Sequence, residues 1–185
     1  MVEFKGTKSS WGLVAKLFHW SLALLLFWQV ATGISLHNME FSPLKMGFII
    51  THKFFGTLVF SLVVLRLMWK YILNTHPKYE NIPLFHKLVS NLVHFTLYGL
   101  VIFIPIQGTF MTWLEGGDVY LLGLIKIPSL IEENFILYPL ALNIHYYSAL
   151  ILTALFTLHI LAALYHRFII RDKYGVWKRM VLKRS

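Results

Sequence analysis

The sequence predicts an all-α integral membrane protein, a four-helix bundle with both termini on the cytoplasmic side. Three observations lead to this fold class. Of the 185 residues, 57% are apolar, which is high for a water-soluble domain. Four apolar runs each reach the roughly 20 residues that a membrane helix needs. The third observation is the uneven distribution of the 17 Lys and Arg residues between the two ends of these runs.

The first run, 13–34, contains Lys16, His19 and Gln29. A cleavable signal peptide is the alternative, because Lys residues precede the run and small residues near Gly33 end it. The run is longer than the apolar core of a usual signal peptide, and its polar residues suit a helix packed inside a bundle. We therefore expect a membrane helix here.

The second, third and fourth runs are 47–72, 90–114 and 145–170, and Pro105 in the third is expected to produce a local kink. The shorter apolar pieces 119–131 and 135–144 contain Pro128 and Pro139 and are expected to lie at the outer membrane surface. Neither a flexible linker nor a convincing repeat divides the chain. We expect one domain, residues 1–185.

Basic residues set the orientation. All but three of the 17 lie at one end of the runs: at or before the start of the first run, from the end of the second run to the start of the third, or from the end of the fourth run onwards. The exceptions are Lys45, Lys53 and Lys126. By the positive-inside rule both termini are cytoplasmic. The net charge of +9 would suggest nucleic acid as a partner of a soluble protein, but here it reports topology, so membrane lipid and no nucleic acid is expected.

Histidines carry the functional information. The chain has no Cys, which excludes disulfides, thiolate-held iron–sulfur clusters and covalent c-type haem attachment. Of the nine His residues, His19 and His159 lie near the inner ends of the first and fourth runs, and His52 and His145 lie near the outer ends of the second and fourth. Imidazoles inside lipid need a partner or a function.

The two fourth-run histidines share a helix face, because His145 and His159 are 14 positions apart. On an α-helix this spacing is about 21 Å along the axis and about 40° around it. His19 can then meet His159 on the inner side, and His52 can meet His145 on the outer side. Two pairs of neutral imidazoles suit the axial positions of two b-type haem irons, and filled axial positions favour electron transfer.

Other polar residues have two open interpretations each. Arg66, 14 positions after His52, either pairs with a haem propionate or extends to the cytoplasmic surface, and Lys53 either does the same on the outer side or marks a helix end. His94 and His166 either hydrogen-bond a propionate or a quinone, or anchor helices at the interface. Small residues either admit a macrocycle or serve helix packing: Gly33, Gly56, Ala162 and Ala163. Three histidines are expected in loops: His37, His76 and His86.

The pattern resembles the bacterial four-helix cytochrome b561 family. The matching stretches are AKLFHWSLALLLFWQVATG, THKFFGTLVFSLVVLRLMWK, VHFTLYGLVIFIPIQG and IHYYSALILTALFTLHILAALYHRF. The resemblance implies a diheme b-type cytochrome of the inner membrane that exchanges electrons with the quinone pool of a respiratory chain, with ubiquinone as a partner. It implies that His19, His52, His145 and His159 are the haem ligands. It also implies an inner quinone site near His94 and His166.

Some members of this family resemble oxidases of periplasmic superoxide, an activity that needs an electropositive outer entrance. The outer connections hold more acidic than basic residues, which argues against superoxide here. One alternative function is that of a haem-bearing anchor subunit of a larger dehydrogenase, for which the outer residues Glu115, Asp118, Glu132 and Glu133 would dock a cationic periplasmic donor or remain a solvated loop. Another is a transporter with a histidine relay. The relay is disfavoured because none of the four runs contains Asp or Glu.

Overall fold

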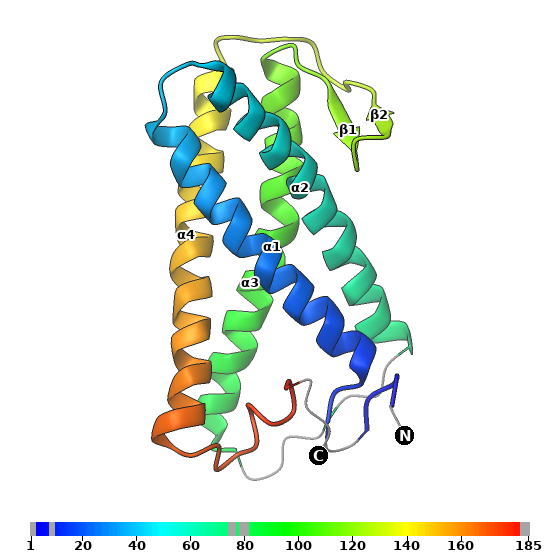
Figure 1. Cartoon of the computed structure of the whole chain (residues 1–185), viewed down its shortest axis with the longest axis vertical. Helices are drawn as coiled ribbons and strands as arrows, with labels where there is room; N and C mark the ends of the chain where they lie inside the picture. Colours follow the sequence, from blue (N-terminus) through cyan, green and yellow to red (C-terminus); the bar gives the residue numbers. More distant parts are fainter. Residues whose placement is uncertain (1–2, 8–9, 74–76, 78–81, 182–185) are drawn as a thin grey trace.

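The computed structural model describes residues 3–7, 10–73, 77 and 82–181 (Figure 1). Within them, the long helices are α1 (Leu13–Asn38), α2 (Pro43–Met68), α3 (Leu84–Leu114) and α4 (Tyr138–Leu164). The π-helical turns η1 (Trp69–Leu73) and η2 (Tyr165–Ile169) extend α2 and α4, and the strands β1 (Val119–Leu121) and β2 (Ile125–Ile127) lie between α3 and α4. Four of these helices are long and apolar enough to cross a membrane, which confirms the predicted fold class.

The helices are longer than the apolar runs that predicted them. α4 begins at Tyr138, so the prediction of a separate interfacial piece at 135–144 was wrong for its last seven residues. Pro139 lies in the first turn of α4, where the missing amide hydrogen breaks no helical hydrogen bond. The same lengthening places His37 in α1 and His86 in α3, so the loop assignment of these two was wrong. His76 lies outside the described residues.

Local sequence explains where the helices begin. Ser42 caps α2, because its hydroxyl accepts a hydrogen bond from the Lys45 amide at 3.2 Å, and Pro43 follows as the first helical residue. Pro105 lies inside the continuous helix α3, where it lacks the amide hydrogen that would bond to the carbonyl four residues earlier. The kink expected at Pro105 stays a prediction.

The helices pack as two pairs, α1 with α2 and α3 with α4, and α2 with α3 joins the pairs (Figure 1). The segment before α1 meets the segment after η2 at one end of the bundle, since the Ser10 hydroxyl donates to the Arg179 carbonyl at 3.5 Å; from α1 itself, the Trp20 indole donates to the Met180 carbonyl at 3.0 Å. Residues near 10 and near 180 therefore lie at the same end of the bundle, and the location of both termini on the cytoplasmic side stays a prediction from the charge distribution.

The core is a narrow apolar cluster to which all four long helices contribute. Its buried members are Leu22, Val59, Val63, Val101 and Leu152. Leu152 lies midway in the sequence between His145 and His159, so this cluster separates the two histidine levels. Outside it, many large apolar side chains are exposed around each helix, as expected for surfaces that face lipid rather than water.

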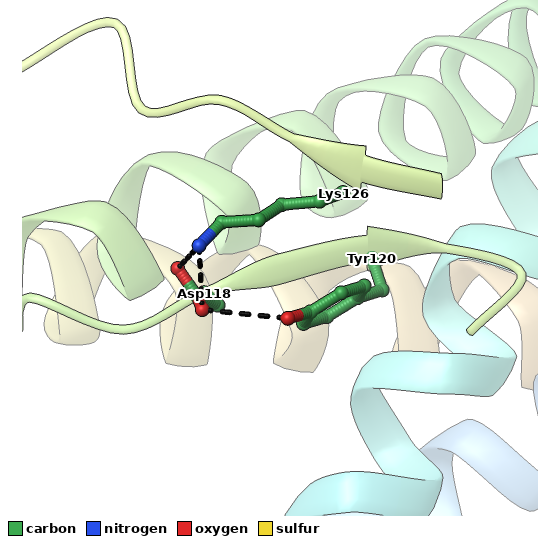
Figure 2. Close-up of polar contacts among 3 residues, drawn as sticks. All are labelled: Asp118, Tyr120 and Lys126. Carbon is green, nitrogen blue, oxygen red and sulfur yellow. Dashed lines mark hydrogen bonds and ion pairs between the residues drawn. The ribbon is translucent and has the colours of Figure 1, made fainter. Parts of the chain in front are cut away.

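Residues 119–131, expected only as an interfacial piece, contain an antiparallel hairpin in which Val119 is paired with Ile127. Its turn contains Leu122, whose amide donates to the Thr57 hydroxyl of α2 at 3.1 Å. An ion pair of 2.8 Å between Lys126 and Asp118 joins the two sides, and the Tyr120 hydroxyl also points to Asp118 (Figure 2). Because Thr57 follows the first turns of α2, the hairpin reaches down beside the bundle (Figure 1).

Candidate functional site

Two pairs of facing histidines lie inside the bundle, and they are the pairs expected from the sequence. The ring centroids of His19 and His159 are 6.2 Å apart with an angle of 84° between the planes. The ring centroids of His52 and His145 are also 6.2 Å apart, with an angle of 73°. We call these the inner pair and the outer pair. Each joins helices remote in the sequence, so that α4 supplies one member of both.

The spacing within each pair fits a metal held between two imidazoles. Bonds of roughly 2 Å on either side of the metal, with roughly 1 Å from each nitrogen to its ring centre, place the two ring centroids roughly 6 Å apart. Both observed separations are 6.2 Å. The described residues contain no group of three or more His, Cys, Asp or Glu placed for a metal. A pair of axial imidazoles therefore suits a metal whose other ligands come from a macrocycle, as in haem.

Glycines lie against the outer pair. A Cβ at Gly33 would be 3.6 Å from Cε1 of His52, and a Cβ at Gly108 would be only 3.1 Å from Cε1 of His145. Gly33, for which the sequence left a macrocycle or helix packing open, therefore lies next to a candidate ligand. Gly56 instead approaches the Gln29 amide, at 3.1 Å from a Cβ built there, which agrees with the helix-packing interpretation.

The outer pair is also held by polar side chains. The Thr32 hydroxyl lies 2.9 Å from Nδ1 of His52, and the Gln107 carbonyl oxygen lies 2.9 Å from Nδ1 of His145. Both partners are buried. Gln29, noted in the first run, donates to the backbone carbonyl of His52 at 3.1 Å. Three polar side chains thus support the outer pair.

The inner pair has a different neighbourhood. His94 packs against His159, with ring centroids 5.3 Å apart, and its Nδ1 lies 2.6 Å from the Ser90 carbonyl. A carbonyl can only accept, so Nδ1 of His94 carries the hydrogen and Nε2 is left as an acceptor. Arg66 is close enough to both inner imidazoles to act on them electrostatically.

Arg66 does not extend alone to the surface. Its Nε donates to the Tyr98 hydroxyl at 2.9 Å, and its guanidinium carbon lies 5.6 Å from the centre of that ring. The Lys70 ammonium lies 5.0 Å from the same ring centre. Arg66, Lys70 and Tyr98 thus form a cluster of two cations and one phenol. Such a cluster suits an anionic group, and a haem propionate has that charge.

His166 lies apart from this cluster, in η2. Its ring is 6.2 Å from that of His86 and 6.3 Å from that of Tyr174, and its Nδ1 is buried with no hydrogen-bond partner among the described residues. The structure therefore brings His94 to the inner pair but places His166 nearer the end of the bundle. An acceptor or donor of a ligand would satisfy that Nδ1.

The outer charges are mostly compensated. Lys53 forms an ion pair of 2.9 Å with Glu115, in addition to the pair between Lys126 and Asp118. Lys53 thus bonds to a carboxylate of the protein itself. Two of the four residues expected to form an acidic docking surface are also engaged, which leaves Glu132 and Glu133.

Sequence reasoning missed Gln107, Thr32 and Gly108. Gln107 and Thr32 carried a usable signal, because polar side chains within apolar runs need partners in a membrane. Gly108 carried none, since small residues in membrane helices usually serve packing alone.

Comparison with known proteins finds relatives over nearly the whole chain. A family model described as prokaryotic cytochrome b561 matches residues 10–183. Among individual proteins, the chain is similar to cytochrome b561 homolog 2 of Escherichia coli (strain K12), with 24% identity over 191 residues that cover 100% of this chain and 97% of the relative.

Proposed function

Because the chain belongs to the prokaryotic cytochrome b561 family, we propose that it is a diheme cytochrome carrying electrons across the bacterial inner membrane between a periplasmic donor and the quinone pool. The family itself identifies a membrane b-type cytochrome of electron transfer. The observation that carries the finer proposal is the equal 6.2 Å separation in two histidine pairs at two depths. One pair provides the ligands for one haem, so two pairs provide for two.

In this proposal His19 and His159 hold the inner haem and His52 and His145 hold the outer one, each through a neutral imidazole nitrogen. Haem, when bound, supplies a carrier that accepts and releases one electron at a time. If both imidazoles of a pair bind the iron, no open position would remain on it for oxygen. The two ligands on α4 are about 21 Å apart along the helix, so two haems together bridge most of the bilayer.

Arg66 and Lys70 are proposed to bind a propionate of the inner haem. The cluster with Tyr98 supports this role, because an Arg that already donates to a phenol still has four N–H groups for a carboxylate. Burying a cation between helices is costly without an anion, and none of the four spans contains Asp or Glu. The propionate would supply the missing negative charge.

The quinone is proposed to bind at the inner end of the bundle. His94 supports this site, because its Nε2 is left as an acceptor beside the inner pair. His166 is the second candidate, since its Nδ1 lacks a partner among the described residues. Reduction of a quinone takes up two electrons and two protons. Nε2 of His94 can accept a hydrogen bond from a quinol hydroxyl and take up its proton when the quinol is oxidised, and in the opposite direction the protonated ring would return that proton to a quinone oxygen.

The donor is proposed to act at the outer level. Lys53 and Lys126 are paired with Glu115 and Asp118, so two of the three outer cations are compensated. A small anion such as superoxide would gain little attraction there, which favours a protein or neutral donor. A haem-bearing anchor subunit of a dehydrogenase is the second candidate, with Glu132 and Glu133 as contacts for its partner.

Pyridine haemochromogen quantitation of the purified protein tests the proposal. We expect about two haems b per chain in the wild type and about one in each of His145→Ala and His159→Ala, because each variant removes one axial ligand of one pair. His37→Ala is the matched control, since His37 stacks on Tyr146 and belongs to neither pair. A wild type without haem would contradict the proposal. Rapid haem oxidation by added ubiquinone would separate a quinone-linked cytochrome from an anchor subunit.

A further inference from the structure

The outer pair differs from the inner pair in what holds its imidazoles. Thr32 and Gln107 are buried, with exposed fractions of 2% and 8%, and each lies 2.9 Å from Nδ1 of one outer histidine. Within the part of the chain that the structure describes, no side chain hydrogen-bonds to the ring of His19 or His159. The inner rings have aromatic neighbours instead, Trp20 and His94.

The direction of the Thr32 hydrogen bond follows from its other contacts. The Thr32 hydroxyl has one hydrogen, which it donates to a backbone carbonyl of its own helix, that of Trp28 at 2.9 Å or Gln29 at 3.2 Å. Its oxygen can therefore only accept from Nδ1 of His52. The hydrogen of the neutral imidazole is then on Nδ1, and the lone pair of Nε2 is left free for a metal.

Gln107 determines the same tautomer for His145. Its amide nitrogen donates to the backbone carbonyl of Ala141, so its amide oxygen is the atom that faces Nδ1 of His145. An amide oxygen accepts, and Nδ1 must donate. Both outer histidines thus have the lone pair of Nε2 free to bind a metal. A rotation of either ring would break its hydrogen bond to Thr32 of α1 or to Gln107 of α3.

We propose that Thr32 and Gln107 are positioning residues of the outer haem site and lower the potential of its iron. The inference rests on the proposed function, because it requires haem between His52 and His145. An acceptor on Nδ1 orients the ring and makes Nε2 a stronger electron donor. Stronger donation stabilises the ferric over the ferrous state. The inner iron, without such partners, is not tuned in this way.

Redox titration of the purified holoprotein, followed by the visible bands of the two haems, tests this. Thr32→Val and Gln107→Leu remove the acceptors at nearly constant volume, and each is expected to shift the ferric–ferrous equilibrium of one haem towards ferrous by up to about tenfold, or about 59 mV for one electron. The potential of the other haem should not move. Thr32→Ser should restore the wild-type potential, and Gln107→Glu should lower it, because a carboxylate accepts more strongly.

Thr153→Val is the matched control. The Thr153 hydroxyl donates to the Ala149 carbonyl of α4 at 2.8 Å, so its removal costs a similar bond without touching a histidine. Unchanged potentials in Thr32→Val and Gln107→Leu, or equal shifts of both haems, would overturn the proposal while leaving the diheme function standing. A wild type that contains no haem would instead overturn the function.

If Thr32→Val loses the outer haem, the Thr32→Ser variant shows whether the missing hydrogen bond or the altered packing is the cause. Ser keeps the hydroxyl but lacks the methyl group. If Thr32→Ser retains the outer haem at the wild-type potential, the hydrogen bond is responsible and the proposal stands. If Thr32→Ser loses it as well, packing of the methyl group is responsible and the proposal fails.

Discussion

Gly108 lies so close to His145 that one added methyl group should disturb the outer pair. A Cβ at position 108 would be 3.1 Å from Cε1 and 3.3 Å from Nδ1 of His145. Carbon atoms in ordinary contact lie about 3.5–4.0 Å apart, so the ring in Gly108→Ala must move by about 0.4 Å or more. Overpacking of this kind costs about 1–3 kcal/mol.

Helix propensity opposes part of this cost. Alanine is favoured over glycine inside a helix by about 0.8–1.0 kcal/mol, and Gly108 lies within α3. Helix propensity acts on folding alone, so the net loss of folding stability is about 1 kcal/mol, while a cost of about 1 kcal/mol or more at the displaced ring weakens retention of the outer haem roughly fivefold or more. The shift of the ring should also weaken its hydrogen bond to Gln107, so the outer haem should change in potential as well as in affinity.

Two further glycines make this prediction a graded series. A Cβ at Gly33 would be 3.6 Å from His52, an ordinary contact, and a Cβ at Gly99, also in α3, would meet nothing within 4 Å among the described residues. The assay is the rate at which haem transfers from each purified variant to an excess of a haem-scavenging globin. Haem transfer should be fastest from Gly108→Ala. It should be slower from Gly33→Ala than from Gly108→Ala, and Gly99→Ala should release haem at the wild-type rate. Equal rates for Gly108→Ala and Gly99→Ala would refute the reasoning.

Three further predictions concern the hairpin, and all can be measured with a spin label attached to position 124. The natural sequence has no cysteine, so the Leu124→Cys variant offers one attachment site for the label. The label should lie in lipid, because the Leu122 amide in the adjacent turn donates to Thr57, which is well inside α2. It should therefore be accessible to oxygen and protected from water-soluble relaxants. Equal exposure to both would place the hairpin in water instead. Thr57→Val leaves the Leu122 amide without its acceptor, at a cost of about 1–3 kcal/mol, and should increase label mobility, whereas Thr57→Ser should not. The hydrogen bond from Lys126 lowers the pKa of Asp118 below its ordinary 3.8, so the ion pair stabilises the hairpin above about pH 4 and is lost as the pH falls through that lowered value. Label mobility should therefore rise only under strongly acidic conditions, and Lys126→Gln should remove this pH dependence.

The membrane architecture could be predicted from local sequence, because the cost of exposing backbone and charge to lipid depends on the length and composition of each segment alone. Helix ends could not be predicted in the same way, since residues 138–144 form the start of α4 although their apolar pattern is short and contains Pro139. The hairpin between β1 and β2 was missed, because its position depends on an acceptor, Thr57, that lies more than 60 residues earlier.

The candidate site divides in the same way. The spacing of His145 and His159 on one helix placed a histidine at each of two depths, and helix direction alone then paired them with His19 and His52. The residues that support the outer pair needed the tertiary structure. Thr32 and Gln107 lie 20 and 38 positions from the histidines they hold, and only the packing of α1 on α2 and of α3 on α4 brings them within 2.9 Å.

The sequence by itself determined the number of membrane helices and the depth of the four histidines, because both follow from periodicity and from the price of polarity in lipid. The tertiary structure alone decided which nitrogen of each outer imidazole faces inward. A tautomer depends on one hydrogen bond to one neighbouring atom, and the choice of that neighbour is made by side-chain packing between helices.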